Sequence, residues 1–188
     1  FGKRLADVLV ELMSDKPVKR VLDLNADTGR LAFELAKHFD DVTALDFTAR
    51  MIRMPIMLQE QGHMRYTMKD EGELVLFSDV VLDDFGLSEG KDKILFMQAD
   101  PMNLKPNYTG YDLVVAANVL NELSDPKLFL SHINERINDG GYLVILSAYD
   151  WDVSRTERNK WIGGFKEDGE PITSLDGLKD VLGTKFEL

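Results

Sequence analysis

Short apolar runs that alternate with segments of helical periodicity constrain the fold of this chain more than any other feature. Apolar residues recur at helical spacing over 5–12, and the apolar run 18–24 follows, bounded by Pro17 and by a polar turn. A second helical stripe at 32–39 leads into the apolar run 42–45. This order predicts parallel strands joined by helices, because parallel neighbours need a crossover connection.

The same alternation continues through the second half of the chain. We expect a helix over 48–61 with a kink at Pro55, strands over 93–98 and 111–117, a helix over 126–137 ended by Gly140 and Gly141, and a strand over 142–147. Strands this continuously apolar are buried on both faces. The predicted fold class is therefore α/β, a doubly wound, mainly parallel sheet with helices on both faces.

One segment interrupts the alternation within the single domain that we expect over residues 1–188. Residues 62–90 combine the stretch RYTMKDEGELVLF with an acidic helical piece, and we expect an insertion beside the sheet, either a lid or a small hairpin. The sequence starts inside a helical pattern and stops at Leu188 in an expected strand. We therefore expect the last strands of the sheet to be missing and the sequence to be a piece of a longer protein.

Charge and composition exclude several classes of function. The 22 basic and 33 acidic side chains give a net charge of −11, which repels phosphate backbones and anionic lipids, so we expect no nucleic-acid partner. No apolar run could span a bilayer and the start does not resemble a secretion signal, so we expect a cytoplasmic protein without a membrane partner. There is no cysteine and the three histidines are scattered, so we expect no metal site.

The polar residues that follow each strand are the candidate ligand-binding residues, because ligands of doubly wound sheets bind beyond the carboxyl ends of the strands. The first strand ends in DLNADTG at 23–29, which resembles the acidic-x-Gly-x-Gly-x-Gly cofactor loop of class I methyltransferases. Asp23, Asn25 and Gly29 are its candidate cofactor residues. Asn25 can adopt the left-handed conformation of a missing glycine, whereas Asp27 puts a carboxylate where that of the cofactor would approach. The alternative is a plain turn whose polar end caps the next helix.

The next two strand ends also carry acids. Asp46 ends the second strand, where its carboxylate can accept hydrogen bonds from both ribose hydroxyls, and Phe47 follows it. Asp100 ends the third strand, where it can accept the adenine amino group, with Pro101 and Met102 beside the ring. Taken singly, Asp46 could cap the helix that starts near Thr48, and Asp100 could do no more than solvate a turn. Three acids at three successive strand ends predict S-adenosyl-L-methionine as cofactor.

Residues after the fourth and fifth strands are candidates for the reacting end of the site. Asn118 ends the fourth strand and would face both the methionine part of the cofactor and the acceptor, with Asn121 close behind it in the sequence. Tyr149 and Trp151 follow the fifth strand and are predicted to form catalytic walls around the acceptor. The alternatives are a solvated helix start for Asn121 and packing against the sheet edge for the two aromatic residues.

Two stretches resemble one particular family, RYTMKDEGEL at 65–74 and WIGGFKEDGEPITSLDGLKDVL at 161–182. Both are similar to the 5-thiohistidine (4-mercaptohistidine) N-methyltransferase domain of ovothiol biosynthesis, which is usually fused behind an iron-dependent sulfoxide synthase. The similarity extends over 46–53, 104–118 and 147–151. It implies methyl transfer to an imidazole nitrogen of 5-thiohistidine, a small-molecule substrate, and a sulfoxide synthase as a fused or separate partner.

A neutral imidazole nitrogen already has a lone pair, so such a site needs mainly to align it and to exclude water. The carboxylate of an amino-acid substrate would favour a cation, and Arg50, Arg65 and Lys160 are candidates, or ordinary surface residues. Two other classes of function stay open. The domain could have lost its activity and serve as a binding or interface module, or it could be a nicotinamide-dependent oxidoreductase, which would require a different glycine pattern.

Overall fold

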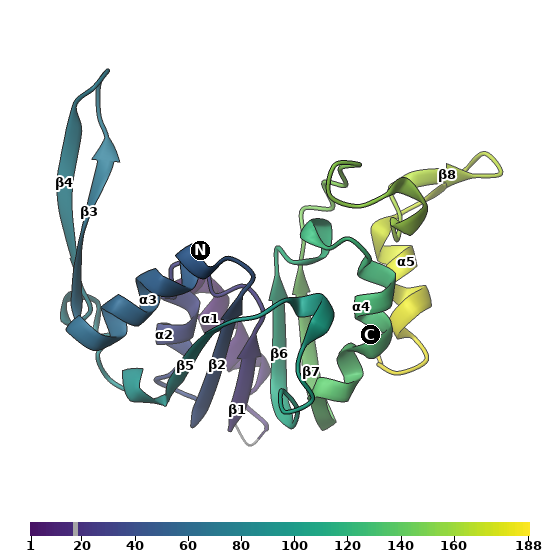
Figure 1. Ribbon diagram of the computed structural model, residues 1–188. Coiled ribbons are helices and arrows are strands. Elements are labelled where there is room, and N and C mark those ends of the chain that lie inside the picture. Colours follow the sequence, from purple (N-terminus) through teal and green to yellow (C-terminus); the bar gives the residue numbers. More distant parts are fainter. Residues whose placement is uncertain (17–18) are drawn as a thin grey trace. The chain divides into compact units, whose positions relative to one another are not determined.

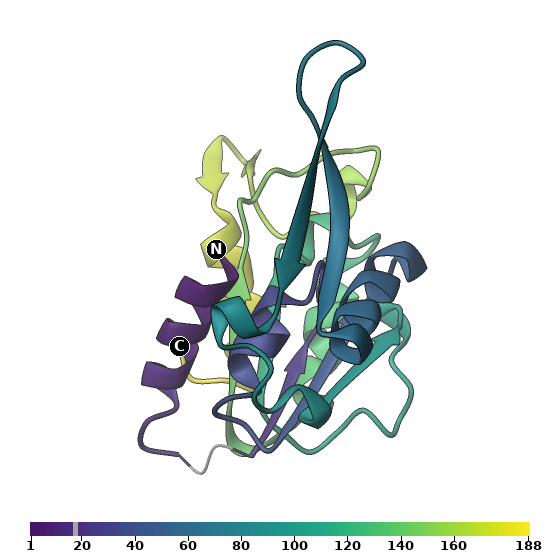
Figure 2. The same cartoon turned by 90° about the vertical axis from the view of Figure 1, so that its left-hand side faces the viewer.

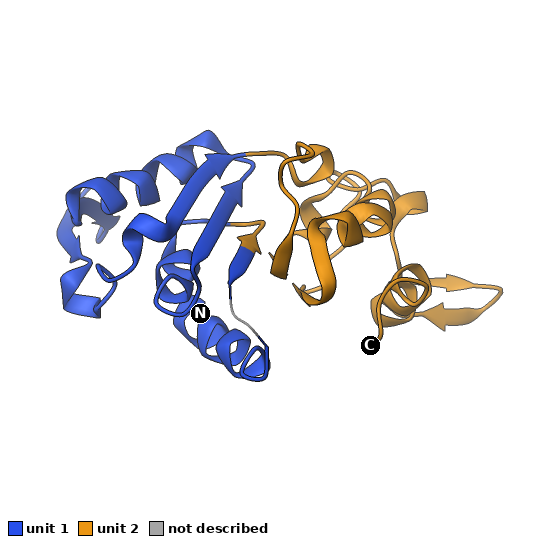
Figure 3. Ribbon diagram, turned by 90° about the horizontal axis from the view of Figure 1, so that it is seen from below, with its two compact units in different colours: residues 1–21, 26–98 blue, residues 22–25, 99–188 orange. Residues whose placement is uncertain are grey.

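The computed structural model describes residues 1–16 and 19–188. The expected boundary at Pro17 and the first residue of the expected strand, Val18, lie outside the described residues. The chain divides into two compact units, residues 1–21 with 26–98 and residues 22–25 with 99–188, which Figure 3 shows in different colours. Five strands form one sheet in the order β5-β2-β1-β6-β7, and β1 (Arg20–Asp23) contributes residues to both units.

The first unit contains the helices and strands that the periodicity predicted in the first half of the chain. Besides β1 it comprises α1 (Gly2–Leu12), α2 (Arg30–Leu35), β2 (Asp41–Asp46), α3 (Ala49–Gln61), β3 (His63–Lys69), β4 (Val75–Val81), β5 (Ile94–Gln98) and the 3-10 turns η1 (Asp83–Phe85) and η2 (Lys91–Lys93). Strands β2 and β5 pair in parallel, with Asp46 opposite Gln98. Helix α1 packs on α2, and α3 packs on β2 and β5. Figure 2 shows α1 and α3 on opposite sides of these strands, as a doubly wound sheet requires.

The insertion is a long antiparallel hairpin made of β3 and β4, in register from the pair His63 and Val81 to the pair Lys69 and Val75. Figures 1 and 2 show that it projects beyond the carboxyl ends of β2 and β5 in the same unit. Cross-strand partners share a face, and one face carries only apolar, aromatic and hydroxyl side chains. These are Met64, Tyr66, Met68, Leu76, Ser78 and Val80. The prediction of a hairpin is confirmed, whereas its action as a lid stays a prediction.

The second unit holds the other half of the sheet. It comprises η3 (Pro101–Asn103), β6 (Tyr111–Ala117), η4 (Leu120–Glu122), α4 (Pro126–His132), η5 (Ile133–Arg136), β7 (Ile137–Leu146), η6 (Arg158–Lys160), β8 (Phe165–Glu167), β9 (Glu170–Ile172) and α5 (Ser174–Leu182). Strands β6 and β7 pair in parallel, and residues 113–117 of β6 are almost completely buried. This continuous burial explains why the fourth strand is apolar from Leu113 to Ala117.

The predicted end of the helix before β7 was wrong. Helix α4 ends at His132 and a 3-10 turn continues to Arg136, while Gly140 and Gly141 lie inside β7. The strand is irregular there, because Tyr111 pairs with Ile137 and Leu113 pairs with Tyr142. A Cβ atom on Gly141 would lie 2.8 Å from the Ile137 side chain and 2.9 Å from the carbonyl oxygen of Asp112. The glycines therefore allow a tight irregularity in the strand and do not end the helix.

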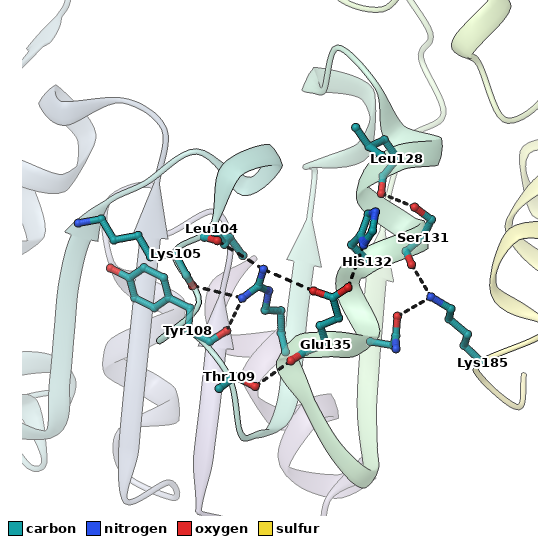
Figure 4. A network of polar contacts seen from close by, with 11 residues as sticks. Leu104, Lys105, Tyr108, Thr109, Leu128, Ser131, His132, Glu135 and Lys185 are labelled. Atoms are coloured by element: carbon teal, nitrogen blue, oxygen red, sulfur yellow. Dashed lines mark hydrogen bonds and ion pairs between the residues drawn. The ribbon is translucent and has the colours of Figure 1, made fainter.

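The expected strand at Leu188 was also wrong, since residues 183–185 form a turn and residues 186–188 have no regular secondary structure. A polar network, drawn in Figure 4, fixes this segment and the loop before β6 to α4 and η5. The Arg136 guanidinium donates to the carbonyl oxygens of Leu104, Lys105 and Tyr108, Thr109 Oγ1 donates to the carbonyl of Glu135, and Lys185 Nζ donates to Asn134 Oδ1 and to the carbonyl of Ser131. Many charge-assisted bonds of this kind give the unit a defined arrangement around β6.

Candidate functional site

The carboxyl end of β1 is tied to β6 within the second unit. The backbone N–H of Leu24 donates to the carbonyl of Val115 at 3.0 Å, and Asn25 Nδ2 donates to the carbonyl of Ala117 at 3.0 Å. Asp23 is completely buried, and its Oδ1 accepts the N–H of Asn25 at 3.1 Å. Strand order changes direction between β1 and β6, so Asp23 and Asn25 lie where this fold class binds its ligands.

The expectation that Asn25 adopts the left-handed conformation was wrong. Asp27 has a φ of 48° and Gly29 a φ of 86°, whereas Asn25 is not among the described residues with positive φ. The physical reason is that the Asn25 side chain holds the loop against β6, which fixes its backbone. Gly29 is required for a second reason, since a Cβ there would lie 2.5 Å from the Pro55 Cβ.

In the first unit, Asp46 organises the other side of the same loop. It is 5% exposed, its Oδ2 accepts the N–H of Asp27 at 3.0 Å, and its Oδ1 accepts the N–H of Thr48 at 2.8 Å. An ionised carboxylate has about four lone-pair sites, so each oxygen can accept one more hydrogen bond. Phe47, the next residue, is 66% exposed, and its ring is available to cover a ligand.

The segment Asp100 to Met102 belongs to the second unit and forms the start of η3. Asp100 Oδ1 accepts the N–H of Met102 at 2.9 Å, so the acid caps this turn. Pro101 and Met102 line a cavity of about 290 Å³ together with residues of α4 and η5. The second oxygen of Asp100, Oδ2, accepts no hydrogen bond within the described part of the chain. Capping by Oδ1 therefore leaves Oδ2 able to accept a hydrogen bond from a ligand.

Asn118 and Tyr149, two candidate catalytic residues, are held in an unusual backbone conformation. Among the described residues, only four that are not glycine have positive φ: Asp27, Asn118 (55°), Tyr149 (54°) and Asp168. Asp168 belongs to the tight turn between β8 and β9, where the sequence Asp-Gly favours this conformation. The other three follow the carboxyl ends of β1, β6 and β7. Asp and Asn adopt this conformation more readily than other residues, so Tyr149 is the most strained of the three, and strained residues concentrate at functional sites.

Asn121 is 6% exposed, and its Nδ2 donates to Glu122 Oε1 at 3.1 Å. Its Oδ1 is buried and accepts no hydrogen bond from any described residue. A buried amide oxygen without a donor costs about 1–3 kcal/mol, so this atom is suited to accept a hydrogen bond from a ligand.

Trp151 lies in an aromatic stack instead of standing free as a wall. Its ring stacks on that of Trp161 with centroids 6.3 Å apart, and its Nε1 donates to Ser174 Oγ at 2.8 Å. Its contact with the acceptor stays a prediction, and the packing alternative explains its position. Sequence reasoning did not identify Arg155, which pairs with Glu122 and lies 3.9 Å from Asp150. A partner 33 residues away leaves no local pattern.

The candidate cations for a substrate carboxylate differ in their availability. Arg65 pairs with Asp79 at 3.5 Å on the hairpin, and Lys160 pairs with Asp125 at 3.5 Å. Arg50 is exposed in the first turn of α3. No helix in residues 1–16 or 19–188 has both the length and the apolar character needed to cross a membrane. Across those residues, the acids and histidines form no cluster suited to a metal ion.

Comparison with known proteins places the chain in a family. Residues 2–182 match the model of a methyltransferase domain family. The highly reducing polyketide synthase ctvA of Aspergillus terreus is 26% identical over 181 residues, which are 89% of this chain and 7% of the synthase. Two solved structures have a TM-score of 0.61. The CurJ carbon methyltransferase is 18% identical, covering 98% of this chain and 46% of its own, and the [4+2]-cyclase SpnF is 19% identical, covering 97% and 56%.

The chain therefore belongs to the methyltransferase domain family, and its fold is the Rossmann-like fold of class I methyltransferases. The cofactor of this family is S-adenosyl-L-methionine, as the strand ends predicted. The chain spans a small fraction of the polyketide synthase and about half of each matched structure.

Proposed function

We propose that this domain binds S-adenosyl-L-methionine and transfers its methyl group to a nitrogen atom of a small molecule. The observation that carries the proposal is the left-handed backbone of Asp27, Asn118 and Tyr149 after three strands of one sheet. Asp and Asn adopt this conformation more readily than other residues, so the strain of about 1–3 kcal/mol applies mainly to Tyr149, and such strain persists where function requires the conformation. The family match to a methyltransferase domain independently supports the cofactor and the methyl transfer.

The residues present fit the cofactor at several points. Asp46 keeps two lone-pair sites for the ribose hydroxyls while it holds the loop through Asp27 and Thr48. Asp100 and Met102 would receive the adenine ring, with Asp100 Oδ2 as acceptor of the amino group. When bound, the cofactor supplies an electrophilic methyl group on a sulfonium centre.

The chemistry of the acceptor end favours a nitrogen nucleophile over a carbon nucleophile. A carbon acceptor must first lose a proton to a positioned base, whereas a neutral imidazole nitrogen has a free lone pair. Residues 118–122 and 147–151 contain no histidine, and their carboxylates, Glu122 and Asp150, both face Arg155. Asn118 and Asn121 can orient an acceptor by hydrogen bonds, but neither amide can act as a strong base.

Within this class, we propose 5-thiohistidine as the acceptor, which rests on the similarity of 65–74 and 161–182 to the ovothiol family. A carbon acceptor of polyketide type is the second candidate, because the relative in Aspergillus terreus is a polyketide synthase and one matched structure is a carbon methyltransferase. The matched [4+2]-cyclase shows that this fold also supports reactions other than methyl transfer. A domain that binds without reacting is the remaining alternative.

The test has two stages. Calorimetric titration with S-adenosylhomocysteine should give micromolar binding, and absence of binding would favour the interface module. Methyl transfer to 5-thiohistidine, histidine, ergothioneine and a β-ketoacyl thioester is then followed by mass spectrometry. Methylation of the thioester alone would replace the nitrogen acceptor by the carbon acceptor, and methylation of none of them by a cofactor-binding protein would refute both acceptors.

Trp151→Ala provides a matched variant for the acceptor stage. If Trp151 orients the acceptor, its removal should lower turnover far more than affinity for S-adenosylhomocysteine, because orientation acts on the reacting geometry. If Trp151 only packs on Trp161 and Ser174, thermal stability should fall, and turnover and affinity for S-adenosylhomocysteine should decrease together.

A further inference from the structure

A second candidate site lies in the second unit, in an open cavity of about 520 Å³ bordered by the start of α4, η6 and β8. Figure 1 shows α4 and β8 in the part of the chain after residue 120. Three cationic side chains line it: Lys127, Arg158 and Lys166. The cavity is lined by none of the residues assigned above to the cofactor or the acceptor.

The charges of these three side chains are not compensated by ion pairs. Within residues 1–16 and 19–188, no carboxylate oxygen lies within 4.0 Å of the charged nitrogens of Lys127, Arg158 or Lys166, whereas Lys160 nearby is paired with Asp125. Glu167 is the only acidic residue among those that line the cavity. All three side chains are exposed and gather around one hollow, so an anion that enters it meets three positive charges and one negative charge.

Aromatic rings complete the cavity. Trp161 and Phe165 line it, and the Arg158 guanidinium lies 5.5 Å from the Trp161 ring centroid, a distance at which a cation is attracted to the ring. Trp161 is fixed in turn, because its other contacts are the Trp151 ring at 6.3 Å and the carbonyl of Thr156, which accepts its Nε1–H at 2.8 Å.

The backbone under these rings is closely packed. A Cβ on Gly163 would lie 2.3 Å from the carbonyl carbon of Thr173, and a Cβ on Gly177 would lie 1.6 Å from the carbonyl oxygen of Ile162. The segment that carries Trp161 and Phe165 is therefore pressed against α5, which leaves its position little freedom. A cavity that exists before the ligand arrives costs less to occupy than one that must form.

We propose that this cavity binds the anionic group of a small molecule, a phosphate or a carboxylate, with an apolar part of the same molecule against Trp161 and Phe165. Its volume falls in the range of small-molecule sites, which combine apolar walls with a few convergent polar groups. Lys127 and Lys166 provide point charges and Arg158 a planar donor for the oxygens. Asn159 adds an amide that can donate to the same group. The proposal does not depend on methyl transfer.

Intrinsic fluorescence is a direct probe, because the chain has two tryptophans and they form the stack at this cavity. The protein is titrated with phenyl phosphate, with benzoate and with neutral benzyl alcohol, at constant ionic strength. We expect saturable quenching by at least one of the two anions and at least tenfold weaker binding of benzyl alcohol. Saturation by only one of the anions identifies the phosphate or the carboxylate as the group recognised.

The variant Lys127→Gln with Lys166→Gln should weaken anion binding at least tenfold, since it removes two charges without shortening the side chains much. Lys105→Gln with Lys179→Gln, which changes the net charge equally at exposed positions of the same unit, should bind within twofold of the unchanged protein. Equal weakening by both pairs of substitutions, equal binding of benzyl alcohol, or no saturation by either anion would overturn the proposal. Titration with S-adenosylhomocysteine tests the proposed function separately, since both double variants should bind it with the affinity of the unchanged protein.

Discussion

Substitution of Asp46 tests the cofactor assignment most directly. The carboxylate accepts two backbone hydrogen bonds, from Asp27 and Thr48, at 3.0 and 2.8 Å, and would accept two more from ribose. Hydrogen bonds to charged groups contribute about 1.5–3 kcal/mol each. Loss of the two hydrogen bonds to ribose in Asp46→Ala should therefore weaken binding of S-adenosylhomocysteine by more than about a hundredfold, since about 1.4 kcal/mol corresponds to a factor of ten.

Asp100→Ala provides the comparison. Asp100 would accept one hydrogen bond from adenine, and it is more exposed than Asp46, so its loss should weaken binding by about tenfold. Affinity is measured by calorimetry at one salt concentration. Asp84→Ala, which removes an exposed acid from η1 of the same unit as Asp46, should leave affinity unchanged.

Asp46→Ala also removes the acceptors for two backbone N–H groups, so its free energy of unfolding should fall by about 3 kcal/mol. Asp46→Asn separates the two effects, because its amide oxygen can still accept from Thr48 while one acceptor is lost. We expect Asp46→Asn to fold with a smaller loss of stability and still to bind at least tenfold more weakly than the unchanged protein. Equal effects of Asp46→Ala and Asp100→Ala, or full affinity in Asp46→Asn, would refute the assignment of the strand ends.

Three further predictions concern strain, charge and packing. Asp27→Gly should raise the free energy of unfolding by about 1 kcal/mol, because glycine adopts a φ of 48° without strain; a decrease in chemical denaturation would show that the Asp27 side chain stabilises the loop. Burial alone would raise the pKa of Glu34, but hydrogen bonds and charges from Lys37 and Arg30 outweigh it and hold the pKa below its ordinary value of 4.5. Its contribution is therefore present above pH 4.5 and is lost as the pH falls through the lower folded-state pKa, so Glu34→Gln should destabilise the protein by about 1–2 kcal/mol at pH 7 and by less at pH 3. Gly177→Ala should prevent normal packing of α5, because its Cβ would overlap the carbonyl oxygen of Ile162; we expect a loss above about 2 kcal/mol, and a melting temperature equal to that of the unchanged protein would contradict the packing described.

The helices and strands of the sheet could be predicted because their signal is local. The part of a strand that is buried on both faces must be apolar, and residues 113–117 of β6 show this directly. The start of β7 could not be predicted, since the irregular pairing of Ile137 and Tyr142 with β6 depends on a partner strand more than 25 residues earlier. Glycines inside such an irregularity have the same sequence signature as glycines that end a helix.

The positions of the candidate site residues could be predicted in part from the sequence, but their hydrogen-bond partners could not. The acids at the strand ends were identified from their positions, but the partners that fix them are distant in sequence. Asn25 bonds to Ala117 and therefore keeps an ordinary backbone, so that Asp27 takes the left-handed conformation instead. No pattern within the loop indicates which of the two residues would do so.

The hairpin of β3 and β4 begins and ends at nearly the same point, because the N–H of Leu82 donates to the carbonyl of Gly62 at 2.8 Å. A segment whose ends meet can be excised and the gap closed by a short linker, without a change in the path of α3 or β5. Evolution could have lengthened, shortened or exchanged this arm while the sheet stayed the same. The arm is therefore the natural place for one member of the family to acquire a partner or a substrate preference that the others lack.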